Sequence, residues 1–167
     1  MTTRHLVAVA VALSLSALAP AAAALQPGDV APPFELQGSQ GGLRLAQLNG
    51  KTVLLDFWAS WCVPCRQSFP WLNQMQSRYG GSGLQVVAIN LDEKREDALA
   101  FLNRYPAAFT VVFDGPGKAA RDYAIKAMPS SVLVGRDGKV VFQHSGFRDA
   151  DKSALELQIR RSLERGT

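Results

Sequence analysis

The sequence predicts a single mixed α/β domain in which helices cover a central β-sheet. Short runs of β-branched and aromatic residues alternate along the chain with longer segments whose apolar residues have helical spacing. The strand-like runs are also continuously apolar, which is typical of strands buried on both faces of a sheet built from β–α–β units. These two observations favour one domain with a buried sheet.

Composition agrees with a folded domain and excludes several classes of protein. Of 167 residues, 47% are hydrophobic and 19% charged, which argues against a disordered chain. The net charge is +4 without a block of Lys or Arg, so nucleic acid is not an expected partner. The two cysteines are too few for a small protein held together by disulfides.

Residues 1–24 have the pattern of a secretory signal peptide. Arg4 is followed by an apolar run over 6–18 and then by an alanine-rich exit. We therefore expect a mature domain at 25–167 that works in the periplasm or another extracytoplasmic space, where thiols tend to be oxidised. The alternative is an uncleaved anchor facing that compartment, because residues 6–24 approach the length of about 20 residues that a membrane span needs.

The elements of the domain follow in chain order. Residues 26–33 and 38–42 are rich in proline and glycine, so we expect loops, turns or an edge segment there. The expected strands are the apolar runs at 53–58, 84–91, 109–113, 132–134 and 140–142. The expected helices lie at 63–79, 93–103, 118–125 and 149–165. Residues 135–138 predict a hairpin, which makes the last two strands antiparallel.

Cys62 and Cys65 lie between a buried strand and the start of a helix. At this spacing their sulfurs can close a disulfide. The first sulfur should lie at the exposed end, where unsatisfied N–H groups and the positive end of the helix dipole stabilise a thiolate. The second sulfur falls about one turn farther in. We expect Cys62 to be the attacking thiolate and Cys65 the resolving thiol.

Three other interpretations of the cysteine pair compete with redox exchange. A structural disulfide across so short a loop would stabilise little. A closed zinc site needs about four ligands, and beyond the leader only His144 could join the cysteines. A copper-delivery module is the third, because thiolates suit Cu(I), although no cluster of Met accompanies the pair. Redox exchange is favoured, and no metal or other cofactor is expected.

Residues 54–65, LLDFWASWCVPC, closely resemble the active-site stretch of thioredoxins. The resemblance follows the order of elements over nearly all of 27–165. With the secretory start, the lead-in at Gly28-Asp29 and an extra helix and strand within 93–113, the chain is similar to the TlpA/ResA branch of extracytoplasmic thiol–disulfide oxidoreductases. The resemblance implies a thioredoxin-like fold with one inserted αβ unit and an enzyme that exchanges dithiols and disulfides.

The resemblance also implies roles for individual residues. Asp56 interrupts an apolar strand, where burial raises the pKa of a carboxyl, and by resemblance it assists Cys65 in proton transfer. Pro129 is implied to follow a cis bond and to present the backbone of Met128 to an extended substrate peptide. Trp61 is expected to be exposed as a contact for partners.

Two differences from related sequences remove side chains that would be expected near Asp56. Ser68 stands where ResA-like proteins have a glutamate, and the strand that in thioredoxin supplies a lysine reads Val86-Val87-Ala88. We therefore expect Asp56 to act with water alone. Elsewhere, the other two tryptophans, Trp58 and Trp71, are expected to pack in the core, and His144 to lie at the surface.

The direction of electron flow is expected to be reductive. Val63-Pro64 resembles the pair between the cysteines of reducing thioredoxins, and the histidine that strongly oxidising proteins of the DsbA kind carry there is absent. The alternative is a disulfide oxidant or isomerase. The resemblance implies disulfides of apocytochrome c or of copper-site proteins as substrates, and a membrane thiol transporter of the DsbD or CcdA kind as electron donor.

Overall fold

The computed structural model describes residues 25–39 and 41–165, so the leader predicted at 1–24 lies outside them. Within these residues, seven strands form one mixed sheet in the order β2-β1-β5-β4-β3-β6-β7. The strands are β1 (Glu35–Gly38), β2 (Gly41–Arg44), β3 (Thr52–Trp58), β4 (Leu84–Asn90), β5 (Thr110–Phe113), β6 (Ser130–Val134) and β7 (Val140–Ser145). The helices are α1 (Cys65–Tyr79), α2 (Arg95–Arg104), α3 (Lys118–Asp122) and α4 (Lys152–Glu164).

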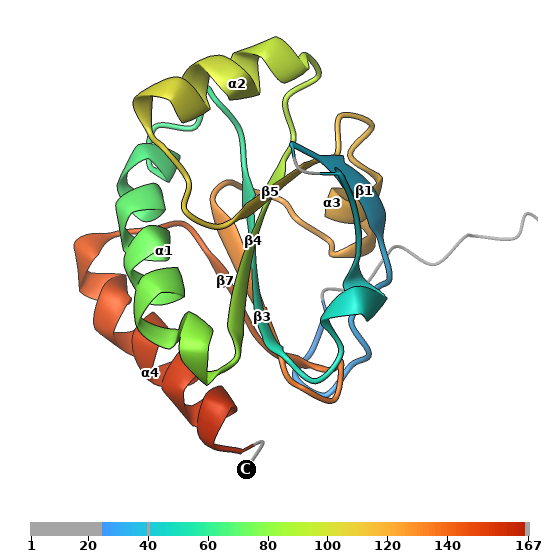
Figure 1. The fold of residues 1–167 in the computed structure, drawn as a ribbon, viewed down its shortest axis with the longest axis vertical. Coiled ribbons are helices and arrows are strands. Elements are labelled where there is room, and N and C mark those ends of the chain that lie inside the picture. Colours follow the sequence, from blue (N-terminus) through green and yellow to red (C-terminus); the bar gives the residue numbers. More distant parts are fainter. Residues whose placement is uncertain (1–24, 40, 166–167) are drawn as a thin grey trace, which may run out of the picture.

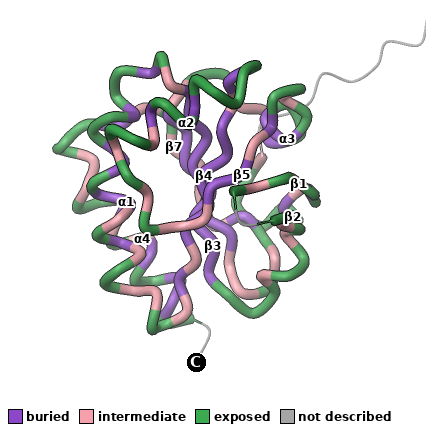
Figure 2. Tube along the Cα trace, turned by 45° about the horizontal axis from the view of Figure 1, so that its top comes forward, coloured by how far each residue is buried: buried purple, intermediate pink, exposed green. Residues whose placement is uncertain are grey.

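The centre of the sheet is formed by β3, in which every residue is buried. β3 pairs with β4 in parallel and with β6 in antiparallel orientation. Figure 2 shows the buried central strands between helices whose outer sides are exposed. A strand covered on both faces needs apolar residues on both, which explains the continuous apolar runs in the sequence.

The two faces of the sheet are covered by different helices. Leu54 and Trp58 of β3 pack in a cluster with residues of α1, α2 and α4. Leu55 and Phe57 point to the other face and pack with α3 and the N-terminal segment. Figure 1 shows α1 and α4 on one side of the sheet and α3 on the other. Because side chains alternate along a strand, Asp56 lies on the face that α1 covers.

The turn predicted at 38–42 joins two short strands, β1 and β2, which the sequence did not predict. The strands are four residues each, too short and glycine-rich to show the alternation that predicts a strand. β1 also pairs with β5 in antiparallel orientation. A Cβ on Gly38 would lie 2.7 Å from the carbonyl oxygen of Val111, so glycine permits this close pairing.

The other elements lie close to their predicted positions, with small differences at their ends. β6 and β7 are antiparallel, as the hairpin signal predicted. α1 begins at Cys65 rather than at 63. α3 ends at Asp122 rather than at 125, and Ala124 has a φ of 52°, which no helix continues. Within the described residues, no helix is long and apolar enough to cross a membrane.

Candidate active site

The two cysteines form a disulfide where the chain passes from β3 into α1. Their Sγ atoms are 2.04 Å apart, and Pro64 precedes the helix. The sequence predicted an exposed Cys62, but only 4% of this residue is exposed, against 0% of Cys65. In this oxidised state the sulfur of Cys62 is bonded to a wholly buried partner, and both cysteines belong to the apolar cluster shared with α1. Cys62 is nevertheless the outer member of the pair.

The N–H groups at the start of α1 are already hydrogen-bonded. The N–H of Cys65 donates to the carbonyl of Cys62 at 3.2 Å, and that of Arg66 donates to the carbonyl of Val63 at 3.2 Å. These hydrogen bonds occupy two of the N–H donors that were expected to be unsatisfied and to face the thiolate, so that part of the prediction was wrong. The helix dipole remains, because the aligned peptide units of α1 direct their positive end toward the cysteines.

Asp56 is a buried acid on the same face of the sheet. It is 1% exposed, and its neighbours Leu54 and Trp58 on β3 belong to the cluster that contains Cys65. Burial raises the pKa of this carboxyl from its ordinary value of 3.8 to about 7, and the hydrogen bond from Ser131 opposes the rise. A carboxyl with this pKa can both accept and release a proton near neutral pH.

Ser131 is the partner of Asp56 that sequence reasoning missed. Its Oγ donates to Oδ1 of Asp56 at 2.9 Å, and the register of β6 on β3 places the two residues opposite each other. Oδ2 of Asp56 is buried and has no hydrogen-bond partner among the described residues. The expectation that the acid has water as its sole partner was therefore wrong. The two serines after Pro129 were the available signal, but the pairing of the strands was needed to interpret it.

His144 lies on β7 opposite Ser131, so Asp56, Ser131 and His144 follow one another across three neighbouring strands. Its side chain is 29% exposed, and its Nε2 atom is buried and lies 3.6 Å from Oδ2 of Asp151. His144 is therefore half-buried, whereas the sequence predicted a residue at the surface.

Ser68, which replaces the glutamate of ResA-like proteins, donates its hydroxyl to the carbonyl of Cys65 at 3.1 Å. In the part of the chain that the structure describes, no three His, Cys, Asp or Glu side chains are placed to hold a metal ion.

The remaining predicted site residues lie at the same edge of the sheet. Trp61 is 66% exposed beside the disulfide, whereas Trp58 is wholly buried. The bond between Met128 and Pro129 is cis, as the resemblance implied. Because the next residue after Pro129 pairs with Phe57 near the end of β3, the proline lies at the edge from which the cysteine loop leaves. The structure thus gathers a disulfide, an exposed aromatic ring and a buried acid.

Comparison with known proteins agrees with this geometry. Residues 26–159 match the Redoxin family. The thiol-disulfide oxidoreductase ResA of Bacillus thuringiensis (strain Al Hakam) is 33% identical over 138 residues, which are 82% of this chain and 79% of the relative. A crystal structure named as a thiol:disulfide interchange protein DsbE from Chlorobium tepidum is 56% identical, with a TM-score of 0.83 over 84% of this chain and 99% of the other. A solution structure named as a protein disulfide isomerase from Bacteroides thetaiotaomicron is 26% identical, with a TM-score of 0.78 over 85% and 92%.

Proposed function

The chain belongs to the Redoxin family and is a thiol–disulfide oxidoreductase of the ResA and DsbE type, and on this premise we propose that it acts as a reductant of protein disulfides. The observation that carries the proposal is the Cys62–Cys65 disulfide at the start of α1, with the buried carboxyl of Asp56 on the same face of the sheet. Exchange between the disulfide and dithiol forms of this pair is the chemistry that the site performs.

The first step belongs to Cys62. In the reduced protein its thiolate attacks one sulfur of a substrate disulfide, the substrate S–S bond breaks, and a mixed disulfide forms. The other substrate sulfur leaves as a thiolate and takes up a proton. Cys62 suits this role because it is the outer cysteine and lies before the positive end of α1, which stabilises its thiolate.

The second step belongs to Cys65 and Asp56. The thiol of Cys65 loses its proton to the carboxylate and attacks the sulfur of Cys62, so the mixed disulfide breaks and the internal disulfide forms again. The second substrate sulfur leaves as a thiolate and takes up a proton, so the substrate is released as a dithiol that has gained two electrons and two protons. The unpartnered Oδ2 of Asp56 supports this role, because it is a buried acceptor without another hydrogen bond among the described residues.

The sequence between and around the cysteines supports the reducing direction. Val63 and Pro64 carry no charged or imidazole group beside the sulfurs, which in strong oxidants stabilises the reduced form. We place the mature protein outside the cytoplasm, with a membrane thiol transporter as its electron donor. Its substrates would then include disulfides of apocytochrome c or of copper-site proteins, which are the substrate classes of the TlpA/ResA branch.

Equilibration with glutathione tests the direction. We expect a potential near the value of about −270 mV for thioredoxin, and a potential near about −120 mV, as for DsbA, would overturn the reductive proposal. The roles of the cysteines are tested separately with insulin as substrate. Cys62→Ser should abolish reduction, whereas Cys65→Ser should accumulate mixed disulfides. Accumulation in Cys62→Ser instead would reverse the two roles.

A further inference from the structure

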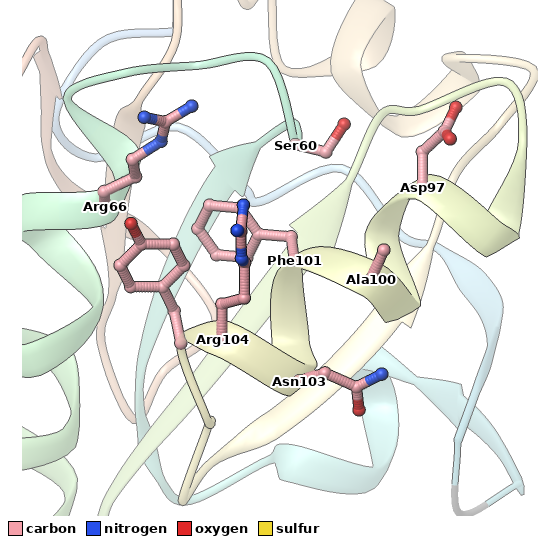
Figure 3. A pocket seen from close by; sticks show the side chains of 8 residues that line it. Ser60, Arg66, Asp97, Ala100, Phe101, Asn103 and Arg104 are labelled. Carbon is pink, nitrogen blue, oxygen red and sulfur yellow. The ribbon is translucent and has the colours of Figure 1, made fainter.

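A cavity lies between the loop that leads to the cysteine pair, the first turn of α1 and α2. Its volume is about 450 Å³. Ser60 enters it from the loop, Arg66 from α1 and Arg104 from α2 (Figure 3). Ser60 precedes Cys62 by two residues, and Arg66 follows Cys65 directly. Neither cysteine lines the cavity, but two of its walls carry residues that flank the pair in the chain.

The cavity has a surplus of positive charge that the described part of the chain does not neutralise. Arg66 and Arg104 are exposed, and neither guanidinium group makes a hydrogen bond or ion pair with another described residue. Asp97 is the one acid among the lining residues, and Figure 3 shows it at the opposite end of the pocket from Arg66. Two like charges thus converge on one cavity, with one acid against them.

Asp92, the acid that contacts Ser60 in the loop wall, already has its hydrogen bonds inside the protein. Asp92 is 6% exposed, and its carboxylate accepts hydrogen bonds at 2.9 Å from both the N–H and the hydroxyl of Ser60. Asn90 donates a third hydrogen bond to it at 2.7 Å. Asp92 therefore holds the loop wall of the cavity in place.

The α2 wall is held by aromatic packing. Phe101 lines the cavity, and its ring centroid lies 4.7 Å from that of Trp58 and 5.0 Å from that of Phe69. Arg104 follows Phe101 by three residues on the same helix face. The position of its backbone is therefore set by the core, so an anion in the cavity meets a preformed wall.

We propose that this cavity binds a carboxylate side chain of the substrate, an Asp or Glu within a few residues of the disulfide that is reduced. A guanidinium group binds carboxylates through two parallel hydrogen bonds, and two such groups favour this anion over a neutral or basic side chain. The inference rests on the proposed function, because it specifies which protein disulfides the site selects. Arg104 lies on α2, so the helix of the inserted αβ unit would help to determine the substrate.

Binding of short peptides tests the proposal without relying on catalysis. Fluorescence polarisation would give Kd values for three labelled peptides in which serines replace the cysteines and the flanking residues are two Glu, two Gln or two Lys. We expect the Glu peptide to bind about threefold to tenfold more tightly than the Lys peptide at low salt, because exposed ion pairs are weak. The preference should fall in the double variant Arg66→Gln, Arg104→Gln.

The matched control is the double variant Arg160→Gln, Arg161→Gln, which removes two exposed charges from the C-terminal half of α4. An equal preference in the wild-type protein for all three peptides, or an equal fall in both double variants, would overturn the proposal. Peptides of the same three sequences that keep both cysteines, joined as a disulfide, test the proposed function separately. If none is reduced, the reductase proposal fails, whereas the Kd values still decide the cavity.

Discussion

Asp56 and Asp114 are equally buried aspartates, each 1% exposed, but their carboxyl groups differ in hydrogen bonding. Both oxygens of Asp114 accept backbone N–H groups at the start of α3, from Lys118 at 2.9 Å and from Ala120 at 3.0 Å. Asp56 accepts one hydrogen bond, from Ser131, and keeps Oδ2 unpartnered among the described residues. Burial by itself therefore does not distinguish the two acids, whereas the unused oxygen does, and it supports the role proposed for Asp56.

The largest expected effect is a fall in stability with pH that comes from Asp56. In the oxidised protein its pKa is about 7, against 3.8 for an ordinary carboxyl. Between these values the unfolded chain has lost its proton and the folded chain has kept it, so rising pH favours unfolding. From pH 4 to pH 8 this carboxyl should cost about 4 kcal/mol of stability.

Urea unfolding of the oxidised wild-type protein and of Asp56→Asn across this range measures that cost. The difference between their free energies of unfolding should grow with pH and level off above about 7. A difference that stays constant with pH would mean that Asp56 does not titrate differently in the folded state.

Asp114→Ala should have the next largest effect, and on stability rather than on chemistry. The change leaves the N–H groups of Lys118 and Ala120 without their carboxylate acceptor, and that of Ala120 is buried, which should cost about 2 to 4 kcal/mol. Insulin reduction by the folded protein at pH 7 should remain near the wild-type rate. Loss of activity without loss of stability would contradict this prediction, because Asp114 would then act in the reaction rather than in the fold.

Asp56→Asn should slow the resolving step roughly a hundredfold at pH 7, because an amide cannot accept the proton of the Cys65 thiol. Stopped-flow decay of the mixed disulfide formed at Cys62 would measure this step. The variant should also be more stable than the wild-type protein at pH 8. A wild-type rate of decay would assign the proton to another acceptor.

The smallest effect is expected for Ser131→Ala. Removing its hydroxyl takes away the hydrogen bond that lowers the pKa of Asp56 in the folded protein, so the pH at which the fall in stability levels off should move upward. Ser130→Ala is the matched control, because Ser130 Oγ bonds the carbonyl of Ala127 and the hydroxyl of Ser145 instead. An equal shift in both variants would indicate a general loosening of β6 rather than the loss of one hydrogen bond.

Local patterns were sufficient to predict the reactive pair and most of the elements. The spacing of Cys62 and Cys65 at a strand-to-helix junction, and the position of Asp56 in an apolar run, involve neighbours in the chain. The β1–β2 hairpin was missed because its residues show no alternation, and β1 is placed by pairing with β5, far away in sequence. The exposure of Cys62 was overestimated for a related reason, since packing from other elements covers it.

The sequence alone determined that this chain folds as a mixed α/β domain with two cysteines at a helix start and an acid in the preceding strand. Hydrophobic periodicity and short-range spacing are properties of neighbouring residues, so they can be read along the chain. Only the tertiary structure decided that Ser131 bonds Asp56 and that Arg66 and Arg104 share a cavity. Those relations depend on strand register and helix packing, which bring distant residues together and leave no local pattern.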